Sequence, residues 1–127
     1  MTAPDRPARL KSAMQLLAKL EATAPEKVIR NLDAFSPDAA ELILGFAFTD
    51  IVSRDGINLK TREMLTVAML AAMGTAPEQL EFHIRAALNT GVSHDEIVEI
   101  IFQVAVYAGV PSCMNAIKAA KKAFAAS

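Results

Sequence analysis

The chain has little of the chemistry on which cofactor-binding or disulfide-stabilised proteins depend. Among its 127 residues there is one cysteine, Cys113, no tryptophan, and five glycines that stand singly. A single cysteine excludes an intrachain disulfide and favours a reducing, cytoplasmic setting. Glycine patterns that bind phosphates or dinucleotides are absent, and we expect no cofactor. The two histidines, His83 and His94, have neither the spacing nor the companion cysteines of a metal site, so no metal is expected.

The sequence also lacks a surplus of one charge and any apolar run long enough for a bilayer. Thirteen basic residues face fourteen acidic ones. The densest basic group, Lys118, Lys121 and Lys122, has helical spacing and is interpreted as a solvated helix face, so no nucleic-acid partner is expected. The apolar run at residues 65–74 has about ten residues, whereas a membrane-spanning helix needs about 20. The N-terminus does not read as a signal peptide, and no membrane partner is expected.

The chain does contain many aliphatic residues at helical spacing. Apolar residues make up 53% of the sequence and aromatic residues only 6%. They recur every three or four positions in residues 8–20, 38–51, 64–73, 76–89, 94–105 and 112–124, with a short helix opening at Thr23. No alternating strand pattern competes. The sequence predicts an all-α, single-domain bundle of about six helices, and its apolar excess predicts burial against other subunits.

Local signals predict where several helices begin and end. Three Ser/Thr-x-x-Glu patterns are typical of capping boxes: Thr23 with Glu26, Thr75 with Glu78, and Ser93 with Glu96. Gly74 and Gly91 are expected to end helices. Between Met64 and Met73 the only polar residue is Thr66, which predicts a helix covered on nearly all sides.

The candidates for chemistry lie between Glu63 and Gly91. His83 borders the apolar stripe of its predicted helix, where an imidazole can exchange a proton near physiological pH. The alternative is a half-buried histidine that bonds a backbone carbonyl. Glu63 begins an apolar helix, and either an N-terminal charge favoured by the helix dipole or an inward-facing proton relay accounts for it. Cys113 has no CxxC partner and is interpreted as a packing residue.

Two segments, TREMLTVAMLAAMG and EQLEFHIRAALNTGVSHDEIVEIIFQVAVYAGVPSCMNA, closely resemble the carboxymuconolactone decarboxylase family. The resemblance covers residues 32–124 as a family core and makes residues 1–31 an N-terminal helical extension within one domain spanning 1–127. It implies an alkylhydroperoxidase D-like helical subunit in a ring-forming homo-oligomer, a trimer or homohexamer. The family includes cofactor-free lyases that decarboxylate a carboxylated muconolactone in aromatic catabolism, and thiol-dependent peroxidases with peroxiredoxin-type activity.

These two branches of the family need different residues. The peroxidase branch carries CxxCxxxH with an upstream glutamate as a proton relay. Aligned through His83, the two cysteine positions fall on Ala76 and Gln79, while Glu63 falls close to the relay glutamate. Because thiol–disulfide exchange needs an attacking and a resolving thiol, the resemblance favours a decarboxylase.

The decarboxylase pattern is matched incompletely, which leaves the substrate open. Decarboxylases of the family tend to read GDIW-[ST]-RPGL where this chain reads TDIVSRDGI, and they tend to have a small polar residue at the position of Glu63. We expect cofactor-independent decarboxylation or proton transfer on a small carboxylated lactone or keto acid. His83 is the expected acid/base, Glu63 its orienting or relay group, and Arg62 or Arg85 the substrate-binding group. The alternatives are a thiol peroxidase and a non-catalytic oligomeric binding protein.

Overall fold

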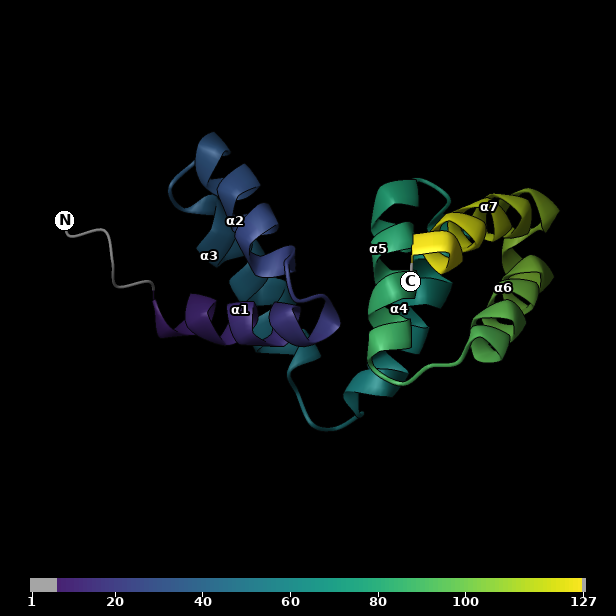
Figure 1. Cartoon of the computed structure of the whole chain (residues 1–127), viewed down its shortest axis with the longest axis horizontal. Coiled ribbons are helices and arrows are strands. Elements are labelled where there is room, and N and C mark those ends of the chain that lie inside the picture. The colour runs from purple at the N-terminus through teal and green to yellow at the C-terminus, as the bar shows by residue number, and fades with distance from the viewer. Residues whose placement is uncertain (1–6, 127) are drawn as a thin grey trace. The chain divides into compact units, whose positions relative to one another are not determined.

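The computed structural model describes residues 7–126, and all regular structure in that range is helical (Figure 1). The all-α prediction is confirmed, with seven α-helices and one π-helix in the described range. The chain divides into two compact units, Met1–Ile57 and Asn58–Ser127. The boundary expected after residue 31 falls inside α2 of the first unit. Within residues 7–126, no helix combines the length and apolarity needed to cross a membrane.

The first unit contains α1 (Ala8–Leu20), α2 (Ala24–Phe35), α3 (Ala39–Leu44) and the π-helix η1 (Gly45–Val52). The helix α1 packs against each of the other three elements. Its buried face is the stripe that the apolar spacing predicted, made of Leu10, Ala13, Leu17 and Leu20. The helix α3 continues into η1 without a break.

Arg9 of α1 contacts the α3–η1 segment on both sides of the α-to-π transition. Its Nη1 donates to the Glu41 backbone oxygen at 3.1 Å and to Glu41 Oε1 at 2.7 Å, while Nε and Nη2 donate to the two carboxylate oxygens of Asp50 at 3.1 and 2.6 Å. In an unbroken α-helix, nine residues make about two and a half turns, which places residues 41 and 50 on opposite faces. The wider π-helical turn, with its i to i+5 bonds, rotates Asp50 back toward Arg9. The Arg9–Asp50 contact is therefore specific to the π-helical register.

The second unit contains α4 (Leu59–Met73), α5 (Pro77–Asn89), α6 (His94–Ala108) and α7 (Val110–Ala126). The helices α4 and α5 run side by side, and α7 packs against α4, α5 and α6 (Figure 1). Val67, Ile84 and Ile97, from three different helices, are each 0% exposed. Burial of one such side chain contributes about 1.5–3 kcal/mol, so these contacts fix how the helices of this unit pack.

The capping box at the start of α6 is confirmed. The Ser93 hydroxyl accepts from the Glu96 backbone N–H at 3.0 Å, and Glu96 Oε1 accepts from the Ser93 backbone N–H at 2.9 Å. Gly74 and Gly91 both have positive φ, 71° and 101°. Residues other than glycine rarely adopt that conformation. Gly74 ends α4, and Gly91 lies just after α5, as predicted from the sequence.

The other two capping boxes are wrong. Thr23 precedes α2 but has α-helical backbone angles and makes no side-chain cap bond, because an N-cap side chain reaches the helix only from an extended backbone. Thr75 lies one residue before the N-cap of α5, which is Ala76, and the helix begins at Pro77. Proline at the first helical position suffices to start that helix.

The prediction that α4 is covered on nearly all sides is also wrong for this chain. Leu65, Met69 and Met73 are 45%, 58% and 58% exposed. They recur at i, i+4 and i+8, which is one face of the helix. The helix α4 packs against α5, α6 and α7 through its other faces. The face that carries Leu65, Met69 and Met73 is left uncovered by the described residues of the unit.

Candidate functional site

Glu63 of α4 and His83 of α5 form a hydrogen-bonded pair. The distance between Glu63 Oε1 and His83 Nδ1 is 2.8 Å. Glu63 is 1% exposed and is the one buried charged residue in the described range, while the His83 side chain is 15% exposed. The structure therefore brings together the two residues proposed from the sequence as acid/base and orienting group.

Local sequence explains why both side chains meet between these helices. Asn58 caps α4 by accepting from the Thr61 N–H at 2.8 Å, so the helix starts just before Glu63. Val67 follows Glu63 at i+4 on the buried face of the same helix. On α5, His83 borders the fully buried Ile84. The inward direction of Glu63 follows from its place on the apolar stripe of α4.

The pair fixes which imidazole nitrogen can exchange a proton. A carboxylate in its charged form only accepts hydrogen bonds, and in that arrangement Nδ1 of His83 is the donor. Among residues 7–126, no hydrogen bond to Nε2 is present. The second nitrogen has no partner in the described range, and a carboxylate at Nδ1 can stabilise a protonated imidazole.

The second carboxylate oxygen of Glu63 has no partner in the described part of the chain. Oε2 is buried and makes no hydrogen bond there. Leaving a buried acceptor unsatisfied costs about 1–3 kcal/mol, so such a group needs an explanation. Oε2 can accept one further hydrogen bond from a donor that enters the site.

The two candidate arginines lie differently with respect to the pair. Arg85 is two residues past His83, about 200° around α5, and its Nη1 donates to Glu81 Oε1 at 3.2 Å. The Glu81 side chain is 30% exposed in that ion pair. Arg62 is half-buried and immediately precedes Glu63 on α4. Arg62 is therefore the arginine on the same helix as the buried carboxylate, and Arg85 lies on the far side of α5 from His83.

Cys113 lies in the core of the second unit. It is 8% exposed and packs in the cluster that contains Val67, Ile84 and Ile101, as expected of a packing residue. Gln79, at one of the two positions where a peroxidase would carry cysteine, lies exposed on α5. Within the described range, no group of three or more potential metal ligands is found.

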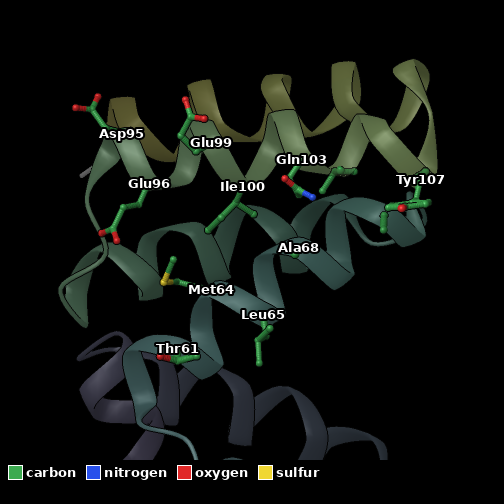
Figure 2. A pocket seen from close by; sticks show the side chains of 13 residues that line it. Thr61, Met64, Leu65, Ala68, Asp95, Glu96, Glu99, Ile100, Gln103 and Tyr107 are labelled. Carbon is green, nitrogen blue, oxygen red and sulfur yellow. The ribbon is translucent and has the colours of Figure 1, made fainter.

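A groove of about 970 Å³ lies between α4 and α6 (Figure 2), and sequence reasoning did not find it. Met64, Leu65 and Ala68 line its α4 side. The α6 side is acidic toward the start of the helix and ends at Tyr107 (Figure 2). Neither Glu63 nor His83 lines this groove, so it is distinct from the pair.

Comparison with known proteins shows which family the sequence matches. The model of the carboxymuconolactone decarboxylase family matches residues 37–122, a range that includes Glu63 and His83. A 4-carboxymuconolactone decarboxylase of Acinetobacter baylyi is 38% identical over 96 residues, covering 76% of this chain and 71% of that protein. A nitrosuccinic acid decarboxylase of Metarhizium robertsii is 35% identical over 97 residues, covering 76% and 67%. An uncharacterized 15.0 kDa protein of Paracoccus denitrificans is 32% identical over 110 residues, covering 86% and 77%.

Proposed function

The chain belongs to the carboxymuconolactone decarboxylase family, and from this premise we propose that it is a cofactor-independent decarboxylase of a small organic acid. The observation that carries the proposal is the 2.8 Å contact between His83 Nδ1 and the buried carboxylate of Glu63. An imidazole oriented by a buried carboxylate is a general acid/base, which is the group that a decarboxylation without cofactor requires.

The proposed substrate class is based on the relatives and on the positions where this sequence departs from the decarboxylase pattern of the family. Two relatives are named as decarboxylases of different small acids, 4-carboxymuconolactone and nitrosuccinic acid. The segment TDIVSRDGI departs from the decarboxylase pattern. We therefore assign the class, a small carboxylated lactone or keto acid such as arises in the breakdown of aromatic compounds, and no individual compound.

The mechanism that the pair supports has two steps. The bond between the substrate carbon and its carboxylate breaks, CO2 leaves, and the electron pair stays on the carbon, where an adjacent electron-withdrawing group delocalises it. The imidazolium of His83 then donates the proton on Nε2 to that carbon, and water restores the proton. Glu63 stabilises the imidazolium through Nδ1–H, an interaction that is stronger in a buried setting than in water.

An arginine is proposed to hold the carboxylate that the reaction does not remove. Guanidinium groups bind carboxylates with two parallel hydrogen bonds, which orient as well as attract. Both Arg62 and Arg85 are candidates, and Arg62 is favoured because it lies about 100° from Glu63 around α4, whereas Arg85 lies about 200° from His83 around α5. Arg85 shares its guanidinium with Glu81 on the opposite side of α5 from His83.

We further propose that the enzyme is a cytoplasmic homo-oligomer, a trimer or a hexamer. Large apolar side chains in the second unit are left exposed, among them Tyr107 at 95% and Met114 at 63%. Exposed apolar patches of this kind are typical of surfaces that subunits bury against each other. The single cysteine, buried in the core, suits a reducing compartment.

The proposal is tested by measuring CO2 release from a panel of small acids. The panel contains 4-carboxymuconolactone, nitrosuccinate and several β-keto acids, each incubated with the purified chain and with its His83→Gln variant. We expect release above the spontaneous rate with at least one acid for the parent chain, and release slower by about 10²-fold or more for the variant. No release from any acid, with the chain folded and assembled, would contradict the proposal.

A further inference from the structure

The groove between α4 and α6 has an acidic end and an apolar end. Asp95 and Glu99 lie at its acidic end on α6, and Tyr107 lies toward the other end of the same helix (Figure 2). Neither Asp95 nor Glu99 has an ionic partner within residues 7–126, whereas their neighbour Glu96 pairs with Lys60 at 3.5 Å. From the start to the end of α6, the groove thus runs from unpaired negative charge to apolar surface.

The exposed face of α7 has the complementary order. Val110 and Met114, 62% and 63% exposed, are followed by the exposed Lys118 and Lys121. These four positions are spaced i, i+4, i+8 and i+11, which is one face of a helix; we call them the α7 stripe. Neither lysine has an ionic partner in the described range. The stripe thus runs from apolar surface to unpaired positive charge.

The α7 stripe is not used by the helix's own packing. The buried face of α7 is a different one, made of Cys113, Ala116, Ala119, Ala120 and Ala123. The stripe is about 17 Å long from Val110 to Lys121, and the groove wall from Asp95 to Tyr107 is about 18 Å long, at 1.5 Å per residue. The two surfaces therefore match in length, in charge and in apolar character when the helices run antiparallel.

We infer that the groove between α4 and α6 is the docking site for α7 of a second copy of this chain. Lys118 and Lys121 of one copy then face Asp95 and Glu99 of the other, and Val110 and Met114 pack at the apolar end. A helix laid into an apolar groove is a common mode of recognition. The groove and the stripe are different surfaces, so the contact is heterologous and forms a ring when its rotation closes. This inference rests on the proposed homo-oligomer and names the surface that builds it.

Reversing the charges of the groove, of the α7 stripe, and then of both tests the inference. One chain carries Asp95→Lys and Glu99→Lys, and the other carries Lys118→Glu and Lys121→Glu. Each alone places like charges across the contact, so we expect its self-association in sedimentation velocity to weaken by about tenfold or more. A chain that carries all four substitutions restores opposite charges at every contact of a ring with any number of subunits, and we expect it to form assemblies of the parent size, measured by native mass spectrometry.

Matched controls separate the contact from general charge effects. Glu78→Lys changes an exposed acid in the first turn of α5, as Asp95→Lys does in α6, and Lys27→Glu changes an exposed lysine of α2. Both controls are expected to assemble like the parent. Glu99→Lys alone repeats the test should a lysine in the first turn of α6 prevent folding.

The outcomes distinguish the surface from the assembly itself. A parent chain that is monomeric at micromolar concentration would overturn both the proposed oligomer and this inference. A parent oligomer whose two single-surface variants still assemble, or whose folded four-substitution variant does not, would overturn the inference and leave the oligomer standing. In that case another surface or another partner occupies the groove.

Discussion

His83 Nδ1 lies 2.8 Å from Oε1 of Glu63, a carboxylate that is 1% exposed. A buried carboxylate keeps such a position only when a partner compensates for its desolvation. Here His83 compensates one of its oxygens, and the other has no partner in the described range. We therefore propose that the pair serves acid/base chemistry and is not only a structural ion pair.

Removing the charge of Glu63 while keeping its shape is expected to slow the reaction. In the Glu63→Gln variant, an amide faces His83 Nδ1 and no longer stabilises the imidazolium, so we expect kcat to fall by about 10²-fold or more with little change in KM. The measurement is steady-state CO2 release, with circular dichroism to verify the fold. A raised KM with an unchanged kcat would show that Glu63 binds substrate and does not assist His83.

The two arginines can be separated by their kinetics. A charge-assisted hydrogen bond contributes about 1.5–3 kcal/mol, or roughly 10- to 100-fold in affinity. We therefore expect Arg62→Gln to raise KM by a factor in that range. Arg85→Gln, on the far side of α5 from His83, is expected to raise it less. A larger effect at Arg85 would reverse the assignment and indicate that the substrate reaches around α5.

The Arg9–Asp50 pair is expected to maintain the π-helical register of η1. Because the Arg9 guanidinium donates two hydrogen bonds to Asp50, the pKa of that carboxyl is lowered from its ordinary 3.8. A lowered pKa in the folded state stabilises the fold above pH 3.8, and this contribution is lost as the pH falls through the folded-state pKa. The thermal stabilities of the parent and of Asp50→Asn are therefore expected to differ near neutral pH and to converge in acid.

A second measurement on this pair concerns the helix itself. In Arg9→Gln, we expect backbone carbon chemical shifts of residues 45–52 to change toward α-helical values, because the contact specific to the π-helical register is gone. Arg30→Gln, which removes an exposed i,i+4 pair with Glu26, is the matched control and should leave those shifts unchanged. Identical shifts in Arg9→Gln and the parent would show that η1 is π-helical for other reasons.

Thiol-dependent peroxide consumption is expected to be absent. Cys113 is the one thiol in the sequence, it is 8% exposed, and turnover through a disulfide needs a resolving partner. We expect Ellman's reagent to react with Cys113 slowly in the native protein and rapidly after unfolding. Rapid native reaction together with peroxide turnover would revive the peroxidase alternative.

Sequence periodicity accounts for part of the fold and part of the site. The stripe of α1 and the capping box at Ser93 follow from local patterns, because both depend on residues within a few positions of each other. The inward direction of Glu63 was one of two interpretations of its helix, and packing against α5 decided between them. The family resemblance brought Glu63 and His83 into one hypothesis, but their distance depends on how two helices pack.

The features that were not predicted all depend on contacts between helices. Arg9 lies 41 residues from Asp50, and no local pattern links a cation in one helix to the register of another. The exposed face of α4 was predicted to be covered because an apolar run does not tell which of its side chains the neighbouring helices bury. The groove between α4 and α6 was not predicted, because its two walls come from helices that are separated in the sequence by α5.

The kcat/KM of the His83→Gln variant decides whether His83 exchanges the proton of a decarboxylation. Measured on the best acid of the panel beside the parent, the variant is expected to lose about 10²-fold or more in kcat/KM. His94→Gln, which changes the exposed histidine of α6, is expected to keep the parent value. A kcat/KM of His83→Gln within about twofold of the parent value would show that no acid/base step depends on that imidazole.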